Sequence, residues 1–401
     1  MSARALACVT GVVALAGCTL ANPFGMECVS DQNCGCSGCC IGYRCANTAS
    51  SGLGSDGGGA ASFWVDTFAG GADAGGEDGL GAAARFDYPA QLALDAQGNL
   101  YVADSGGNCV RKIDAAGNVT TLDAADAPCG GAGLDNPWGV AVDGAGDVFV
   151  ANTGMNCLVS LVPGASGGDG RFHVLAGTCQ KTGYNCGDTA TRSVQFAGPM
   201  GLAYAAPYLF VADASNNVVR YVHDGDGVVG TLAGQAGGTA PLADGTCDFG
   251  QSCGAENGST FNNPTSLTAA AGALFVADGL NCAVREISLA RGCDVSTLGA
   301  SGCPMFTGQR GPGRLANPAG VAVAPSGVVF VADPGNHRVA ALDASGALTN
   351  VAGDGASGFA DGRGATARFA SPSGIALDAQ GRLFVADGEN HRIRVLTPVA
   401  P

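Results

Sequence analysis

Short apolar segments separated by turns recur along the chain from residue 62 onward. Residues 317–339 contain Asn-Pro-Ala-Gly-Val-Ala-Val, then Val-Phe-Val-Ala-Asp, then Gly-Asn-His-Arg-Val, and residues 371–393 repeat this order. Each copy predicts three short strands, and a Val-x-Thr-x-Ala-Gly segment such as Val229–Gly234 supplies a fourth. Four strands joined by tight turns form one small antiparallel sheet, which cannot bury both of its faces alone.

Six copies of this unit can be counted. In every copy 14 or 15 residues separate a proline from the polar residue that ends the second strand, whereas successive prolines are 48 to 65 residues apart. The prolines are Pro89, Pro137, Pro199, Pro264, Pro318 and Pro372, and the polar residues are Asp104, Asn152, Asp213, Asp278, Asp333 and Asp387. The pattern predicts an all-β fold, a six-bladed β-propeller of four-stranded antiparallel blades.

The two ends of the repeat region are complementary. The sixth copy stops after its third strand, near residues 392–396, while a spare strand-like segment, residues 63–70, precedes the first copy. We expect this segment to complete the sixth blade, because joining the two ends in one sheet removes a free edge.

This pattern resembles the NHL repeat, over roughly residues 62–398. The resemblance implies a six-bladed propeller. The histidine of the motif occurs only at His337 and His391, with Asn217 and Cys282 in its place in two copies. In the first two copies the asparagine falls one position later, at Asn108 and Asn156. We therefore carry no functional residue over from the family.

The first 17 residues are typical of a secretory signal, with Arg4 followed by an apolar run too short to span a bilayer. Residues 15–18, Leu-Ala-Gly-Cys, resemble the lipobox of bacterial lipoproteins. This resemblance implies lipidation of Cys18, and Thr19 favours the outer membrane. We expect a cell-envelope protein, periplasmic or surface-exposed; the alternative is an ordinary secretory signal in which Cys18 has no role.

Three further regions follow the signal. Residues 18–45 contain the lipidated cysteine and a small disulfide-rich module, residues 46–61 are a Gly/Ser-rich linker, and residues 62–401 form the propeller. The module is too short for a hydrophobic core, so three disulfides are the simplest explanation of its cysteines, with fifteen pairings open and zinc binding as an alternative. These cysteines are Cys28, Cys34, Cys36, Cys39, Cys40 and Cys45.

Ten more cysteines lie in the propeller. In an oxidising compartment we expect disulfides inside single loops, Cys179 with Cys186 and Cys247 with Cys253. Weaker suggestions are Cys109 with Cys129, and Cys282 with Cys293 or Cys303.

Charge narrows the choice of partners. The chain carries 34 acidic and 19 basic residues, a net charge of −15, which argues against nucleic acid and anionic membrane surfaces as ligands. Residues 76–79 and 224–227 contain clustered acidic residues, but no complete calcium-ligand set. We interpret them as turns and expect no cofactor, with calcium as the alternative.

The polar residue that ends each second strand is expected to stabilise a turn by accepting backbone N–H groups. Arginines lie seven residues further on in four copies and are expected to pair with these carboxylates between blades, or else to bind a ligand: Arg111, Arg220, Arg285 and Arg394. His337 and His391 are expected to form hydrogen bonds in turns.

A binding site is expected where the first strand of each blade reaches the central channel. The residue between proline and glycine is predicted to surround the channel mouth, namely Ala90, Trp138, Met200, Thr265, Ala319 and Ser373, with Gln91 in place of glycine in the first copy. Trp138 and Met200 form either an apolar binding patch or a plug in the channel. The candidate binding residues are Trp138, Met200, Thr265, Ser373 and Gln91.

The sequence is compatible with two functions. The first is a non-catalytic, monomeric, lipid-anchored binding or scaffold module for a protein, peptide or glycan. The second is a metal-dependent lyase or hydrolase acting at the channel, as in peptidyl-hydroxyglycine amidating lyase, whose site requires inward-facing His, Tyr and Arg. The chain has only four histidines, two of them in repeat turns, so binding is favoured.

Overall fold

The computed structural model describes residues 40–41, 44–45, 63–122, 129, 133–163, 170–185, 193–224, 227–237, 242–247, 258–290, 293–299 and 313–399. The chain forms two compact units, Met1–Ala60 and Ala61–Pro401. In the first, strands β1 (Cys40–Ile41) and β2 (Arg44–Cys45) are antiparallel, with Cys40 opposite Cys45. The expected lipidation site Cys18 and the cysteines Cys28, Cys34, Cys36 and Cys39 lie outside the described residues.

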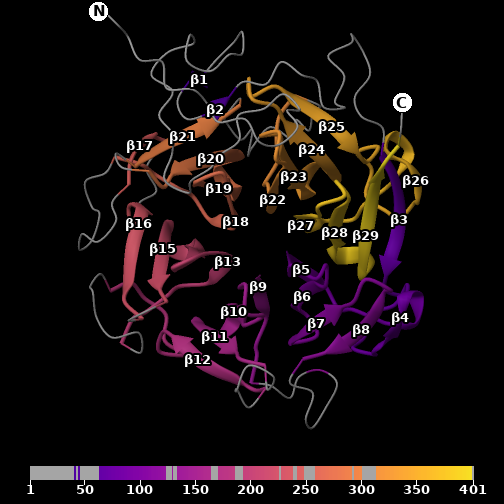
Figure 1. Ribbon diagram of the computed structural model, residues 1–401, viewed down its shortest axis with the longest axis horizontal. Coiled ribbons are helices and arrows are strands. Elements are labelled where there is room, and N and C mark those ends of the chain that lie inside the picture. The colour runs from indigo at the N-terminus through magenta and orange to yellow at the C-terminus, as the bar shows by residue number, and fades with distance from the viewer. Residues whose placement is uncertain are drawn as a thin grey trace, which may run out of the picture. The chain divides into compact units, whose positions relative to one another are not determined.

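The second unit is a six-bladed β-propeller, as predicted. Figure 1 shows six antiparallel sheets arranged around a central axis, with the first strand of each repeat innermost. Blade 1 contains, from the inside outwards, β5 (Pro89–Leu94), β6 (Leu100–Asp104), β7 (Cys109–Ile113), β8 (Asn118–Thr121) and β4 (Gly79–Leu80). Blade 2 contains β9 (Pro137–Val142), β10 (Val148–Asn152), β11 (Cys157–Leu161) and β12 (Phe172–Ala176). Blade 3 contains β13 (Pro199–Ala205), β14 (Tyr208–Asp213), β15 (Val218–His223) and β16 (Val229–Gly234).

The remaining three blades follow in the same order. Blade 4 contains β18 (Pro264–Ala270), β19 (Ala273–Asp278), β20 (Ala283–Ser288), β21 (Asp294–Leu298) and β17 (Gly245–Thr246). Blade 5 contains β22 (Gly320–Val323), β23 (Val329–Asp333), β24 (Arg338–Leu342) and β25 (Leu348–Ala352). Blade 6 contains β27 (Pro372–Leu377), β28 (Leu383–Asp387), β29 (Arg392–Pro398), β3 (Phe63–Ala69) and β26 (Gly362–Arg363).

Three blades differ from the four strands predicted. In blades 1, 4 and 6 a two-residue strand, β4, β17 or β26, adds a fifth, outermost position. Each comes from the loop that leads into a blade, so the long loops cover part of the outer edge. Short outer strands limit the number of unpaired backbone groups at the sheet edge.

The ring closes as the sequence predicts. The N-terminal strand β3 pairs antiparallel with the C-terminal strand β29, with Val65 opposite Leu396 and Thr67 opposite Arg394. Blade 6 therefore contains both ends of the propeller, and neither β3 nor β29 is left as a free edge.

The core is divided among the interfaces between neighbouring blades. The described buried apolar side chains form six clusters, each shared by two consecutive blades. Between blades 6 and 1, for example, Phe384 and Ile393 meet Phe86 and Leu100. The hydrophobic core of the propeller thus lies between the sheets.

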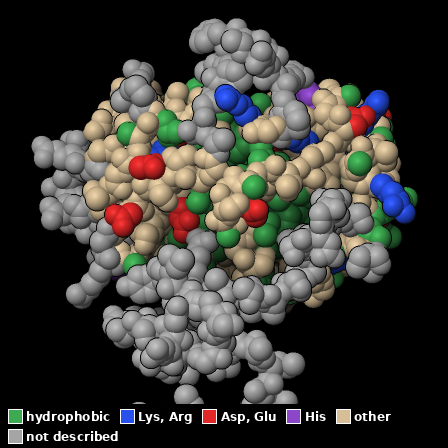
Figure 2. Space-filling model, turned by 90° about the horizontal axis from the view of Figure 1, so that it is seen from above, with side chains coloured by type: hydrophobic (Ala, Val, Ile, Leu, Met, Phe, Trp, Pro, Cys, Tyr) green, Lys and Arg blue, Asp and Glu red, His purple; other side chains and the backbone are tan. Residues whose placement is uncertain are grey.

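Short 3-10 turns connect the second and third strands of blades 2–6, and no helix in the described part of the chain is long and apolar enough to cross a membrane. On the side of the molecule in Figure 2, acidic and basic side chains are few and scattered among uncharged ones.

Candidate functional site

The polar residue that ends each second strand anchors the loop leading into its own blade. All six are buried, and one side-chain oxygen accepts a backbone N–H from the residue two positions before the repeat proline, at 2.7–2.8 Å. In blade 6, for example, Ala370 N donates to Asp387 Oδ1. The expected N–H acceptance is therefore present, but the donor lies in the entering loop and not in the adjacent turn.

The arginines pair with these carboxylates within a blade, not between blades as expected. Arg111 Nη1 lies 3.2 Å from Asp104 Oδ2, and Arg394 Nη1 lies 2.8 Å from Asp387 Oδ2, with all four side chains fully buried. Arg111 also donates to the carbonyl oxygens of Arg85 and Glu77 in the entering loop. Both partners sit on neighbouring strands of one sheet, so the pair can fix a loop but cannot reach a ligand.

Burial dominates the acidity of these carboxyl groups. Desolvation raises the pKa of Asp104 to about 7 although Arg111 opposes the shift, and it raises the pKa of Asp213 to about 6 against Arg220. It likewise raises the pKa of Asp278, Asp333 and Asp387.

A second internal network joins consecutive blades. The residue four positions after each strand-ending polar residue has a positive φ of 51–58°. In blades 1 to 4 and in blade 6 its side chain accepts the N–H of the pre-proline residue of the next blade. Examples are Asn108 Oδ1 from Asn136 (2.6 Å) and His391 Nδ1 from Tyr88 (3.2 Å). Asn108 and Asn156 thus occupy the position of His337 and His391. The interpretation that the motif asparagine falls one position later in the first two copies is therefore wrong, because these asparagines stand at the histidine position of the motif.

The predicted ring of residues around the channel mouth is only partly correct. Trp138 and Met200 are partly exposed, but Ala90, Thr265, Ala319 and Ser373 are buried. The buried hydroxyls link blades: Thr265 Oγ1 donates to Pro318 O at 2.9 Å, and Ser373 Oγ donates to Pro89 O at 3.0 Å. Thr265 and Ser373 therefore belong to the packing between inner strands, and ligand contact by them is not supported.

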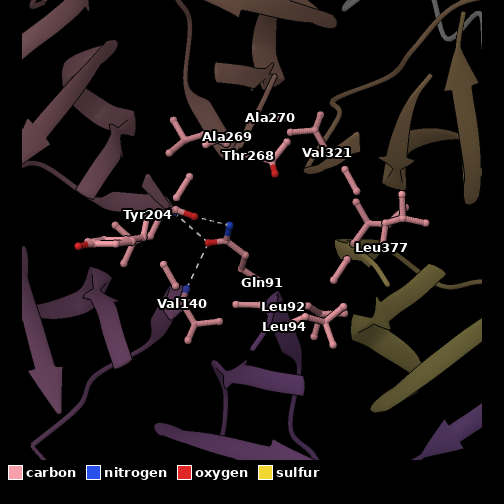
Figure 3. Close-up of a pocket in the computed structure, with 18 of the residues that line it drawn as sticks. Gln91, Leu92, Leu94, Val140, Tyr204, Thr268, Ala269, Ala270, Val321 and Leu377 are labelled. Atoms are coloured by element: carbon pink, nitrogen blue, oxygen red, sulfur yellow. Dashed lines mark hydrogen bonds between the residues drawn. The ribbon is translucent and has the colours of Figure 1, made fainter. Parts of the chain in front are cut away.

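The inner strands meet closely at the glycine position of each repeat. A Cβ added at Gly139 would overlap Met200 O, and one at Gly374 would overlap Ala90 O. In blade 1 this position is Gln91, whose buried side chain extends into the channel (Figure 3). Its Nε2 donates to Leu202 O at 3.0 Å, and its Oε1 accepts from Val140 N at 3.2 Å and Leu202 N at 3.0 Å. Gln91 joins blades 1, 2 and 3 inside the channel.

A cavity of about 310 Å³ occupies the channel. All six inner strands line it with mostly aliphatic side chains, and the polar side chains in the described lining are Gln91, Tyr204 and Thr268. The Tyr204 ring points away from the centre, and its hydroxyl donates to Asp224 at 2.7 Å. Burial and the Asp224 carboxylate raise the pKa of Tyr204 to about 12. Trp138 and Met200 are not part of the lining, so they do not plug this cavity.

Trp138 instead pairs with an aromatic residue that was not among the predicted binding residues. Its ring lies 6.2 Å from that of Tyr88, centroid to centroid, at an interplanar angle of 46°. Both rings are partly exposed. The hydroxyl end of Tyr88 faces the Gly388–Glu389 turn, because a Cβ built on Gly388 would lie 3.4 Å from Tyr88 Cζ. Burial and, secondarily, the charge of Glu389 raise the pKa of Tyr88. We call these two residues the aromatic pair.

Tyr88 occupies an unusual backbone conformation. The pre-proline residue has a positive φ of 47–56° in all six repeats, and in the other five it is Asn136, Gly198, Asn263, Asn317 or Ser371. Glycine and asparagine tolerate this region, whereas a bulky aromatic residue rarely adopts it. An alignment of the six pre-proline positions within the chain identifies Tyr88 as the exception.

The disulfides connect segments more distant than expected. Cys109 bonds to Cys129, as suggested, but Cys179 bonds to Cys157 and Cys247 to Cys293, so both expected single-loop pairings are wrong. Cys282 is also disulfide-bonded, and its partner is not Cys293. Cys186 and Cys253 lie outside the described residues. Two of these bonds attach a third strand, β7 or β11, to the loop that follows its blade.

Among the described residues, the one group of side chains placed like metal ligands already forms other bonds. Asp104, Cys109 and Cys129 place ligand atoms within 4.8 Å of one another, but the two sulfurs are bonded together and Asp104 pairs with Arg111. In the expected turn at residues 76–79, Asp78 accepts from Arg111 and from Thr121. Residues 225–226 of the second acidic turn lie outside the described part.

The architecture and the repeat together define the class of protein. The NHL repeat family matches residues 86–113, 134–159, 315–342 and 369–396, which lie in blades 1, 2, 5 and 6. Four of the six blades of the propeller described above therefore contain NHL repeats.

Known relatives share only part of this chain. Protein SUPPRESSOR OF QUENCHING 1, chloroplastic, of Arabidopsis thaliana is 33% identical over 133 residues, 30% of this chain and 12% of the relative. NHL repeat-containing protein 2 of Bos taurus is 33% identical over 151 residues, 34% of this chain and 21% of the relative. Most of the length of each relative thus lies outside the region that matches this chain. An auxiliary nutrient binding protein from Bacteroides ovatus matches in structure with a TM-score of 0.60 and 16% identity, over 84% of this chain and 77% of that one, which shows the fold alone.

Proposed function

We propose that this protein is an extracytoplasmic, lipid-anchored binding module whose protein, peptide or glycan ligand contacts the aromatic pair, Tyr88 and Trp138. The observation that carries the proposal is the break in repeat symmetry. Where other blades have Asn, Gly or Ser the chain has Tyr88, and where they have Ala, Met, Thr or Ser it has Trp138. Residues that break a local rule at a partly exposed position are expected at functional sites.

The surroundings of the pair favour a preorganised site. Tyr88 N–H donates to His391, and the N–H of its neighbour Asp87 donates to the buried Asp104. The Cys109–Cys129 disulfide adds a covalent link to the loop that leads to Trp138. Fixed aromatic side chains lose little conformational entropy on binding, which makes them effective contact residues.

An extracytoplasmic location is supported by the disulfides, which persist in oxidising compartments. The lipid anchor rests on the resemblance of residues 15–18 to a lipobox. Intact mass of membrane-extracted protein tests it: we expect a chain that begins at acylated Cys18. A mature chain with unmodified Cys18, or one that begins at Thr19, contradicts the anchor but leaves the binding site unaffected.

Binding is tested with an array of oligosaccharides and synthetic peptides probed with wild-type protein and two tryptophan variants. Trp138→Ala is expected to reduce the wild-type signals at least tenfold, because it removes half of the aromatic pair. Trp64→Ala is the matched control, since Trp64 is 44% exposed on the outer strand β3. Signals that survive Trp138→Ala, or an array on which nothing binds, would contradict the proposed site.

The enzyme alternative lacks support at the cavity. Its described lining contributes no histidine, arginine or carboxylate side chain. The four histidines belong to blades 2, 3, 5 and 6, where His173 and His223 lie in β12 and β15, and His337 and His391 in inter-strand turns.

A further inference from the structure

The charged groups near the aromatic pair are unevenly distributed. Each blade contributes two short segments to this end of the propeller, the two residues before the repeat proline and the three after the strand-ending polar residue. Across all six blades these described segments contain Asp87, Asp135 and Glu389, but no lysine or arginine. The three carboxylates come from blades 1, 2 and 6, the same blades that form or contact the aromatic pair, whereas blades 3–5 contribute none.

The positions of these carboxylates are known from their contacts. Glu389 is exposed and follows Gly388, against which the hydroxyl end of Tyr88 lies. Asp87 precedes Tyr88, and its Oδ1 is 3.6 Å from His391 Nδ1 with the side chain 41% exposed. Asp135 is exposed, three residues before Trp138, and borders Gly154.

The two rings can bind one group between them. With centroids 6.2 Å apart, a group placed midway above the pair can lie within about 6 Å of both, the range in which a cation is attracted by an aromatic ring. Aromatic rings beside solvent-exposed carboxylates attract cations by two independent forces, the ring quadrupole and the carboxylate charge. A neutral sugar would benefit only from the rings.

On this basis, and resting on the proposed function, we infer that the aromatic pair binds a positively charged group, the arginine or lysine side chain of a peptide or protein ligand. The Asp87, Asp135 and Glu389 carboxylates attract it, and the rings contact it directly. Because the net charge of −15 attracts any cation at long range, the specific contribution must be separated from this background.

The tryptophan content allows a direct readout. The chain has two tryptophans, so Trp64→Phe leaves Trp138 as the only one, and its fluorescence reports on the site. This protein is titrated with a blocked Gly-Arg-Gly-Arg-Gly peptide, with the same peptide containing citrulline, a neutral isostere of arginine, and with cellohexaose. We expect a saturable change with the arginine peptide and at least tenfold weaker binding of the citrulline peptide.

Further variants identify the groups responsible. In the Trp64→Phe background, Glu389→Gln is expected to weaken binding of the arginine peptide at least threefold. Tyr88→Asn is expected to weaken it at least tenfold. Asp73→Asn, which removes one negative charge at another exposed position, is expected to change it less than twofold.

Each outcome decides between the two claims. Equal binding of the citrulline peptide, a stronger response to cellohexaose, or equal effects of Glu389→Gln and Asp73→Asn overturns the inference about charge while the proposed site stands. If none of the three probes changes Trp138 fluorescence, the cationic inference fails, and the array experiment then decides the proposed function independently.

Discussion

Blades 6 and 2 hold their entering loops by the same hydrogen bond but with different chemistry around it. In blade 6 Asp387 accepts Ala370 N–H, pairs with Arg394, and Arg394 lies over Phe369. In blade 2 Asn152 accepts Asp135 N–H. The position equivalent to the arginine is Val159, and the position equivalent to the phenylalanine is Leu134. The charge and its partner are thus absent together.

The comparison shows that the repeated polar residue has an architectural role. An accepted N–H is common to all six blades, but a buried carboxylate occurs only where a guanidinium accompanies it. Blade 5 is an intermediate case, since Asp333 pairs with Arg338, five residues further on, and Ala340 and Leu315 take the other two positions. A buried charge without its partner is strongly destabilising, which accounts for the joint replacement.

The largest effect is expected when the pair in blade 6 is broken on one side. Arg394→Met leaves Asp387 buried without its cation and should lower the free energy of unfolding by about 3–5 kcal/mol. Adding Asp387→Asn removes the buried charge and should recover part of this loss, because the amide oxygen of the new side chain still accepts Ala370 N–H, although its amino group then faces Asn390 Nδ2, which donates to Asp387 Oδ2 in the wild type. Equilibrium denaturant unfolding measures both. A double variant no more stable than the single one would disprove the charge-partner explanation.

The reverse change in blade 2 should be somewhat smaller. Asn152→Asp introduces a buried carboxyl group into a blade that has Val159 in place of the arginine, and we expect a loss of about 3 kcal/mol at pH 7.5. The loss should shrink at pH 5, because the carboxyl group can remain protonated there. Unfolding curves at the two pH values test this, and an equal loss at both would exclude ionisation as its cause.

The raised pKa values predict how stability of the natural protein depends on pH. A carboxyl group with a pKa near 3.8 when unfolded and about 7 when folded, as for Asp104, holds its proton longer in the folded state. Its contribution is fully present below pH 3.8 and is lost as pH rises through 7. Between pH 5 and 7.5 we expect a decrease of about 2–3 kcal/mol from this group.

A matched variant isolates this contribution. Asp104→Asn with Arg111→Val imitates blade 2 inside blade 1, and the pH dependence of its unfolding free energy should be correspondingly flatter. The carboxyl groups with lowered pKa, such as Asp95 and Asp343, act only below about pH 4 and do not affect this range. A variant with the pH dependence of the wild type would contradict the raised pKa of Asp104.

Much of the propeller could be predicted from sequence because its spacing is constant. The 14- or 15-residue distance from the proline to the strand-ending polar residue predicts the hairpin, and the six copies predict the number of blades. The additional strand at residues 63–70 predicts closure of the ring. The disulfides could not be predicted in the same way. Cys179 lies seven residues from Cys186 in sequence, but the pairing of β11 with β12, which places Leu158 opposite Ala176, brings Cys157, 22 residues away, next to it.

Only one of the two residues of the aromatic pair, Trp138, was predicted from the sequence. The side chains between proline and glycine were expected to face the channel mouth, but adjacent inner strands approach so closely that Ser373 and Thr265 are enclosed between them. Trp138 is too large to be enclosed and remains partly exposed. Tyr88 was not among the predicted site residues, although it is the one aromatic residue at the six pre-proline positions of the sequence.

The central claim is that the aromatic pair serves binding and not folding, and the unfolding free energy of Trp138→Ala tests it most directly. Blades 1 and 5 already have alanine at this position, Ala90 and Ala319, so we expect a loss below about 1 kcal/mol. Truncation of a core tryptophan costs about 3–5 kcal/mol. A loss in that range would show that Trp138 is part of the core and would contradict the account.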